Sequence, residues 1–400
     1  MSSIRYLDFD GKNLQTKLED CRKMFWTDLE EEYLETAKRQ IEEILRMDFT
    51  EGIKAERYER NSEREGYRGG YRYRDLTIWG GRIKKLKVPK GERGYSFWLL
   101  EPYKRRAEKL SGAMYRAYIY GMSDRKVSKY FKELYGEEVL TPAGVSYLYK
   151  QMSKDVGVWH TRAIKAEYRY IYFDAMYQSV RGAIRHQRAI LAAYGEKTDG
   201  TKEVIDYRVE TGESASAWAR FIESLYERGL KGKEMRLIIH DGCQGLIEAL
   251  KWVWPDVKTQ LCYIHRMRNL SNRVKNKLVK RKIMKEAWQI YYADNRGKAY
   301  SKIRVFEKRW KYCEPNAIRL FLKDIEHSLT YFDFPKEDWG RIKSTNPLER
   351  QIEEWKRRLI PMRCFKNTNS CDRILYGIIQ ELYQNQKENA QIQKSELLLT

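Results

Sequence analysis

The spacing of hydrophobic residues divides the start of the chain into a helical part and a hairpin part. Residues 13–47 place Leu, Phe, Trp and Ile at helical intervals among charged residues, which predicts one or two amphipathic helices. In residues 56–76, Arg alternates with Tyr and Gly, and the glycines prevent a regular helix. Residues 76–94 alternate apolar and basic positions around Gly80 and Gly81, which predicts a second β-hairpin after the first basic stretch.

Helical spacing returns between residues 103 and 152, where three successive helices are predicted. Thr141 is the expected N-cap of the third, with Pro142 at its first helical position. Three helices with a short second turn are the sequence form of a helix-turn-helix, whose third helix would enter a DNA major groove with Ser146 and Lys150 facing outward. Many three-helix bundles have this spacing without binding DNA, so a purely structural bundle remains the alternative.

The middle of the chain then has the pattern of strands. In Tyr168–Arg181, five of the six residues before Asp174 are β-branched or aromatic, which predicts a central strand covered on both faces. Residues 188–194 and 203–209 are the next two predicted strands, and an antiparallel meander is the simplest arrangement of the three. A helix and a buried strand follow, over residues 213–229 and 235–242.

Three acids stand out against these elements. Asp174 lies in the apolar strand, Asp241 lies at the carboxyl end of the later one, and Glu349 lies in the first turn of a helix that Asn346 is expected to cap. Each has an ordinary alternative, because an Asp at a strand end can open a turn and a Glu in a first turn suits the helix dipole. The three together indicate a shared site more strongly than any one alone.

Charge identifies the class of partner. The 400 residues contain 78 Lys and Arg against 56 Asp and Glu, a formal net charge of +22, and such a surplus favours nucleic acid. No apolar run approaches the roughly 18 residues of a spanning helix, and the first residues lack a signal-peptide core. Six sparse cysteines suit a reducing compartment. We therefore expect a cytoplasmic protein with no membrane association, bound to the nucleoid if bacterial.

Seven stretches of the chain resemble transposases of the Mutator type, found in bacterial insertion sequences and related eukaryotic elements. They occur in the family's order and comprise GYRGGYRYRDL (66–76), GMSDRKV (121–127), YIYFDAMY (170–177), ESASAWARFIESLYERGL (213–230), HDGCQGL (240–246), QLCYIHRMRNL (260–270) and STNPLER (344–350). The resemblance implies a ribonuclease H-like catalytic core with an Asp, Asp, Glu triad, and the matching positions are Asp174, Asp241 and Glu349.

The resemblance and the patterns together predict an α+β, multidomain chain. Its expected parts are a helical and basic hairpin region for DNA binding (1–100), a helix-turn-helix-like bundle (101–160), the first part of a mixed-sheet core (161–268), a helical insertion (269–343), the end of the core with the Glu-bearing helix (344–382) and a polar tail (383–400).

Phosphodiester chemistry explains why such a site needs three carboxylates. Water must be activated at neutral pH and charge on the leaving oxygen neutralised, and two Mg²⁺ ions about 3.5 to 4 Å apart do both. Mg²⁺ prefers oxygen ligands and keeps several waters, so three acids suffice, with Mn²⁺ as a substitute. By resemblance, the freed 3′-hydroxyl then attacks target DNA in the same site.

Cys262 and His265 form a C-x-x-H pair. Zinc would need two further ligands, and no second pair lies nearby in the sequence. The resemblance makes the pair a companion of Asp241 that supports the active site, where His265 would donate to a phosphate or steady that acid. The alternative is a buried cysteine and an ordinary core histidine.

Basic residues are the candidates for DNA contact, either through phosphates or, in the Arg- and Tyr-rich stretch, by stacking on bases. Each is also open to the simpler interpretation of a solvated surface or a charged hairpin edge. The predicted DNA-binding residues are Arg68, Arg72, Arg74, Ser146, Lys150, Arg266, Arg268, Arg350, Arg357 and Arg358.

The sequence thus predicts a Mg²⁺-dependent transposase that binds the terminal inverted repeats of its insertion sequence and cuts and joins strands. Double-stranded DNA, at the transposon ends and at the target, is the expected partner, and bringing two ends together favours a homodimer. A catalytically inactive regulator with the same fold is one alternative, which the three intact acids disfavour. A nuclease that cuts structured DNA without joining it is the other.

Overall fold

The computed structural model describes residues 14–60, 62–78, 80–91, 94–100, 108–135, 141–181 and 185–397. The chain divides into two compact units, Met1–Tyr149 and Lys150–Thr400. None of the helices within the described ranges combines the length and the apolarity needed to cross a membrane.

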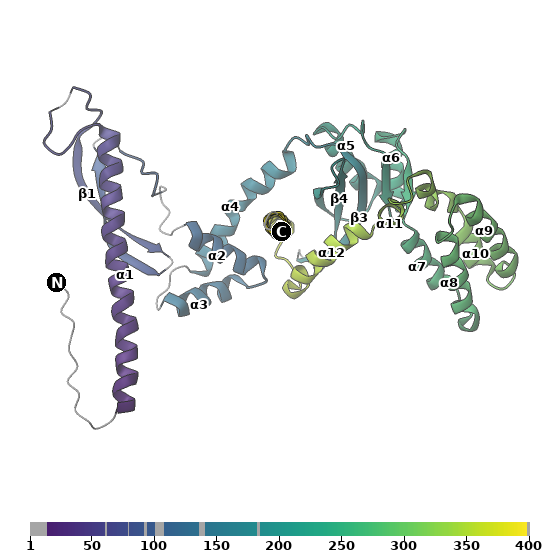
Figure 1. Cartoon of the computed structure of the whole chain (residues 1–400), viewed down its shortest axis with the longest axis horizontal. Helices are drawn as coiled ribbons and strands as arrows, with labels where there is room; N and C mark the ends of the chain where they lie inside the picture. The colour runs from purple at the N-terminus through teal and green to yellow at the C-terminus, as the bar shows by residue number, and fades with distance from the viewer. Residues whose placement is uncertain are drawn as a thin grey trace. The chain divides into compact units, whose positions relative to one another are not determined.

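One long helix and one hairpin build the first part of the N-terminal unit. Helix α1 spans Leu14–Ile53, and strands β1 (Arg68–Ile78) and β2 (Gly81–Gly91) pair antiparallel (Figure 1). The C-terminal half of α1 packs on the hairpin through buried residues that include Leu45, Phe49, Leu86 and Val88. The hairpin predicted around Gly80 and Gly81 is confirmed, since Ile78 pairs with Gly81. It is not a second hairpin, because the basic stretch before it supplies its first strand.

Three helices complete this unit: α2 (Glu108–Ile119), α3 (Asp124–Tyr135) and α4 (Pro142–Thr161). They enclose a small core of Met114, Val127, Phe131, Val145 and Tyr149. The predicted cap is confirmed, since Thr141 Oγ1 accepts a hydrogen bond from the Gly144 amide at 3.1 Å. Helix α4 runs further than predicted and crosses the division between the two units. Its role as a DNA-recognition helix remains a prediction.

A five-stranded mixed sheet forms the centre of the second unit, in the order β5-β4-β3-β6-β7. Strand β3 (Tyr168–Arg181) lies in the middle and is buried along most of its length, as the sequence predicts. Strands β4 (Arg185–Lys197) and β5 (Lys202–Glu210) continue from it antiparallel, whereas β6 (Leu237–His240) and β7 (Thr259–Leu261) run parallel to it. The meander is confirmed; β7, only three residues long, was not predicted.

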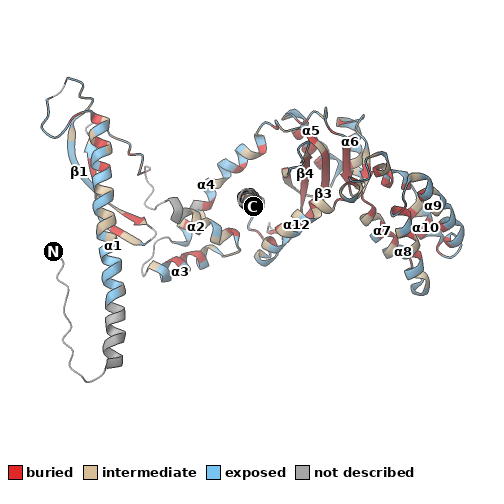
Figure 2. Ribbon diagram, viewed as in Figure 1, coloured by how far each residue is buried: buried red, intermediate tan, exposed pale blue. Residues whose placement is uncertain are grey.

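Helices cover both faces of this sheet (Figures 1 and 2). Helices α5 (Ala215–Glu227) and α6 (Gln244–Val253) pack together against the face that carries Phe173. Helix α12 (Asn346–Leu359) packs against β3, and α13 (Thr368–Leu397) packs against β5. Because side chains alternate along a strand, Asp174 points to the face opposite Phe173.

Between β7 and α12 the chain is helical. The buried face of each longer helix meets its neighbours, for example through Ile283, Phe306 and Phe321. That this segment is an insertion into a family core remains a prediction. Its elements are α7 (Tyr263–Arg273), α8 (Lys277–Tyr291), α9 (Arg296–Trp310), α10 (Pro315–Leu322), the 3₁₀ turns Ile325–Ser328 and Thr330–Asp333, and α11 (Trp339–Ile342).

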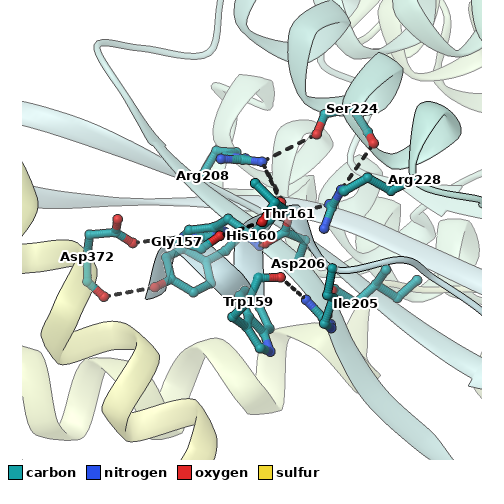
Figure 3. A network of polar contacts seen from close by, with 12 residues as sticks. Gly157, Trp159, His160, Thr161, Ile205, Asp206, Arg208, Ser224, Arg228 and Asp372 are labelled. Atoms are coloured by element: carbon teal, nitrogen blue, oxygen red, sulfur yellow. Dashed lines mark hydrogen bonds and ion pairs between the residues drawn. The ribbon is translucent and has the colours of Figure 1, made fainter. Parts of the chain in front are cut away.

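A buried ionic network ties the end of α4 to the sheet (Figure 3). His160 Nδ1 lies 2.7 Å from Asp206 of β5, and its Nε2 lies 3.1 Å from Asp372 of α13. Arg228, just after α5, donates to the other oxygen of Asp206, and Arg208 donates to the His160 carbonyl at 3.2 Å. Burial works to lower the pKa of His160, but the hydrogen bonds to the two carboxylates outweigh it, so the pKa is raised.

We expect His160→Gln to destabilise the protein more at low pH than at high pH. A raised folded pKa means that the stabilisation is fully present below the unfolded value of about 6.5 and is lost as the pH rises through the folded value. Losing one partner of a buried charged pair costs about 3 kcal/mol. Urea unfolding at about pH 6 and about pH 9 measures this. His186→Gln, at an exposed position, is the control; an equal loss at both pH values would contradict the charged state of His160.

Candidate active site

The register of two parallel strands brings Asp174 and Asp241 side by side. Phe173 of β3 pairs with His240 of β6, and each of these two residues is followed by an aspartate. Both carboxylates lie on the sheet face opposite Phe173. Phe173 and His240 are paired and point to the same face, and successive residues alternate between the two faces. The sequence alternative that Asp174 opens a turn at a strand end is excluded, since β3 continues seven residues beyond it, to Arg181.

A tight turn fixes the direction of Asp241. Its Oδ1 accepts a hydrogen bond from the Cys243 amide at 3.0 Å. Gly242 between them has φ +98°, and an added Cβ would lie 3.2 Å from Leu261 of the neighbouring strand. Glycine is needed for this conformation, so the aspartate is held at the sheet end by the backbone itself.

Glu349 reaches the same face from the first turn of α12, the helix packed on β3. Thr345, and not the predicted Asn346, is the N-cap; Asn346 is already helical. The Thr345 hydroxyl lies 3.2 Å from Glu349 Oε1 and donates to it. This contact gives the carboxylate a defined direction, one turn from the start of the helix.

The pKa of Asp174 reflects its burial and the charged groups near it. Burial raises the pKa of Asp174 to about 7, and the charge of Asp241 adds to the rise. His265 and the Ala175 amide, which donates to Asp174 Oδ1 at 2.8 Å, work in the opposite direction, and Glu349 raises the pKa further. The charges of Asp241 and Glu349 are therefore close enough to Asp174 to raise its pKa.

Cys262 and His265 stand at the start of α7, beside Glu349. His265 Nε2 lies 3.5 Å from Glu349 Oε1, so the histidine faces Glu349. Its predicted action on Asp241 remains a prediction. Ligand atoms of Cys262, His265 and Glu349 all lie within 4.8 Å of one another. Burial raises the pKa of the Cys262 thiol. Its sulfur accepts from the Thr345 amide at 3.4 Å and lies 3.4 Å from the Thr345 hydroxyl oxygen, whose hydrogen points to Glu349.

The chemistry of the donors fits a hard divalent cation. Burial, with the charges of Asp241 and Glu349 adding to it, raises the pKa of Asp174 to about 7, and a bound cation would stabilise its charged form. Oxygen ligands of this kind suit Mg²⁺ and Mn²⁺. Asp174, Asp241 and Glu349 are the residues that would hold such an ion.

Glu213 is an acid near this site that the sequence analysis did not single out. It lies just before α5, and burial raises its pKa, with the charge of Asp241 contributing. The Cys243 thiol donates to the Glu213 carbonyl at 3.8 Å. The only sequence signal for Glu213 was its place as the first residue of the ESASAW stretch. Nothing in the spacing of the strands indicated that Glu213 would lie near Asp241.

Two of the predicted DNA-binding arginines hydrogen-bond to backbone carbonyls within the chain. Arg266 is largely enclosed: its Nε and Nη2 donate to the Phe321 carbonyl at 3.2 and 2.8 Å, and Nη2 also donates to the Lys323 carbonyl. It thus satisfies the C-terminal carbonyls of α10. Arg68 donates to Thr50 and to the Ala55 carbonyl, at 2.8 and 2.9 Å, and joins the end of α1 to the hairpin.

The other predicted contacts are more accessible. Arg357 is exposed and pairs with Glu354 on its own helix. Arg74, Ser146 and Arg358 are partly buried. Those with exposed side chains are Arg72, Lys150, Arg268 and Arg350. DNA contact by any of these residues remains a prediction.

Comparison with known proteins identifies the family. The model of a family described as "Transposase, Mutator family" matches residues 11–389. The transposase for insertion sequence element ISRM5 of Rhizobium meliloti (strain 1021) is 31% identical over 88% of this chain and 88% of its own. The transposase for insertion sequence element IS256 in transposon Tn4001 of Staphylococcus aureus is 32% identical over 89% of this chain and 90% of its own. The catalytic domain of Mos1 mariner transposase covers 43% of this chain and 89% of its own at 14% identity, with a TM-score of 0.18, too low to define the fold. The chain belongs to the Mutator family of transposases.

Proposed function

We propose that this transposase binds the terminal inverted repeats of its insertion sequence through its N-terminal unit, and cuts and joins DNA strands at Asp174, Asp241 and Glu349. The observation that supports this site is the pairing of two neighbouring parallel strands, which aligns Asp174 with Asp241, while Glu349 on the packed helix α12 is close enough to raise the pKa of Asp174. The proposed core is ribonuclease H-like, with the helical segment before α12 as its insertion.

The residues of the chain have separate tasks in this mechanism. Asp174 and Asp241 bind the divalent ions from a rigid sheet, and Glu349 binds them from the first turn of α12. Bound Mg²⁺, or Mn²⁺ in its place, lowers the pKa of water and neutralises charge on the leaving oxygen. Thr345 orients Glu349, and His265 next to it donates to the same carboxylate or to the scissile phosphate.

Cleavage and joining are one type of reaction used twice. In the first, water attacks the phosphorus, the bond to the leaving oxygen breaks, and a 3′-hydroxyl is released. In the second, that hydroxyl attacks a phosphorus of target DNA, and the target's own 3′-oxygen leaves. Each step exchanges one P–O bond for another, so no covalent enzyme intermediate is needed. Two ends must be held together, for which we propose a homodimer.

Incubating the full chain with an end-bearing duplex, target DNA and Mg²⁺ tests this function. We expect cut strands and, from them, strands joined to target, resolved on a denaturing gel. Cut strands without joined products would instead support a nuclease. A shifted band with no cutting would support a regulator that has kept the fold and lost the catalysis.

A fragment comprising residues 1–161, which keeps α4 whole, is expected to bind end DNA by itself. Binding should weaken steeply as salt rises, because each neutralised phosphate releases counterions. Fluorescence anisotropy across a salt series measures this, after circular dichroism has established that the fragment is helical. A folded fragment that leaves DNA unbound at low salt would contradict the assignment of DNA binding to the N-terminal unit.

A further inference from the structure

The segment from the end of α7 into α8 is rich in basic residues and contains no acid. Residues 273–285 contain seven basic residues and no acid. The seven are Arg273, Lys275, Lys277, Lys280, Arg281, Lys282 and Lys285.

Three of these cations form one exposed row on α8. Ile283, Ala287 and Ile290 are buried and define the packed side of the helix. Lys277, Arg281 and Lys285 are all exposed and are spaced four residues apart. Side chains at this spacing share a helix face and are about 6 Å apart along the axis. A row of that length can follow several successive phosphates of a DNA strand.

Three basic side chains elsewhere in the same helical segment are paired with acids. Arg296 pairs with Asp333 at 2.8 Å, Lys298 with Asp294 at 2.6 Å, and Arg309 with Glu286 at 2.5 Å. Across the described residues, none of the seven basic side chains in 273–285 takes part in an ion pair or a side-chain hydrogen bond. Their mutual repulsion is therefore not relieved within the chain.

The run is joined to the active site by a rigid path. His265, which faces Glu349, lies in the first turn of α7; the exposed Arg268 and Arg273 follow on the same helix, and Arg273 is about 12 Å further along it at 1.5 Å per residue. The corner between α7 and α8 is fixed by the buried Glu314, whose Oε1 accepts from the amides of Lys275 and Asn276 at 3.1 and 2.7 Å. Figure 1 shows α7 and α8 leading away from the sheet.

We propose that the exposed face of α8, together with the corner before it, binds the phosphate backbone of duplex DNA next to the catalytic centre. This surface rests on the proposed function and is separate from the N-terminal unit. Flexible Lys and Arg side chains that contact phosphates, and not the edges of bases, bind DNA without reading its sequence. The surface therefore holds DNA beside the scissile bond, whichever sequence the DNA has.

The test is the salt dependence of DNA binding by the full chain. Lys277→Gln, Arg281→Gln and Lys285→Gln are combined in one variant, and affinity for a mixed-sequence duplex is measured without divalent ions. Removing three phosphate contacts should reduce the slope of log K against log salt by about 2.7, at about 0.9 for each contact. The matched control combines Arg304→Gln, Lys308→Gln and Lys311→Gln, three exposed positions of α9 and its end that remove the same charge.

The control should keep the wild-type slope, and both variants should keep the wild-type melting temperature. A wild-type slope in the α8 variant would overturn this inference and leave the proposed function standing. An equal fall in both variants would also overturn it, by showing an effect of net charge alone. A wild-type chain that binds no duplex at any salt concentration would overturn the proposed function itself, and this surface with it.

Discussion

Asp174→Asn is expected to abolish strand cleavage while leaving the affinity for end DNA nearly unchanged. The carboxylate is proposed to hold metal ions and not DNA, and the loss of a metal ligand removes several kcal/mol of transition-state stabilisation, a fall in rate of about 10³-fold or more. Cleavage of an end-bearing duplex in Mg²⁺ and anisotropy of the same duplex measure the two properties. Cleavage retained by this variant would remove Asp174 from the site.

The same substitution is expected to raise the stability of the metal-free protein at about pH 8. The pKa of Asp174 is raised from 3.8 to about 7, so its ionisation in the folded state costs at most about 4 kcal/mol, at about 1.4 kcal/mol per pKa unit. That cost is absent below the unfolded value and grows as the pH rises towards the folded one. Asn carries no charge, so the gain over wild type should shrink at low pH. Melting curves without divalent ions measure it.

Glu349→Gln is expected to lose cleavage as completely as Asp174→Asn, whereas Glu353→Gln should keep measurable activity. The two glutamates are four residues apart and share a helix face, so the sequence alone cannot separate them. Glu349 lies 3.2 Å from the Thr345 hydroxyl and 3.5 Å from His265, while Glu353 is exposed. The substitutions are chemically identical, so Glu353→Gln is a matched control for the change of charge.

The opposite pattern of activity would place the metal site one turn further along α12. It would also show that the match of STNPLER to the family pattern had assigned the wrong acid. Loss of activity in both variants, with melting temperatures unchanged, would indicate that the two acids act together.

The sequence predicted the parts of the fold that short-range patterns specify. A run of aromatic and β-branched residues predicts strand β3, and Thr141 followed by Pro142 predicts the start of α4. These signals are local, because side-chain alternation and capping depend on residues a few positions apart. The parallel pairing of β3 with β6 depends on residues more than 60 positions apart, and only the structure shows that it aligns Asp174 with Asp241.

Hydrogen bonds to distant carbonyls could not be predicted from the sequence for the same reason. Arg266 looked like one of several surface cations, but its partners are the carbonyls of Phe321 and Lys323, more than 50 positions away. Arg68 likewise joins two elements of the N-terminal unit. Glu213 was overlooked because its nearness to Asp241 follows from the packing of α5 on the sheet. Charge in a sequence identifies a class of partner, whereas the contact made by each basic residue depends on tertiary structure.

Mapping the metal site with Fe²⁺ tests the central claim most directly. Fe²⁺ bound in place of Mg²⁺ generates hydroxyl radicals in the presence of ascorbate and peroxide, and these cut the polypeptide next to the ion, so no catalytic activity is needed. We predict cuts beside Asp174, Asp241 and Glu349, suppressed by excess Mg²⁺ and lost in Asp174→Asn. Cuts clustered elsewhere in the chain, or the same cuts in the variant, would contradict a metal site built from these three acids.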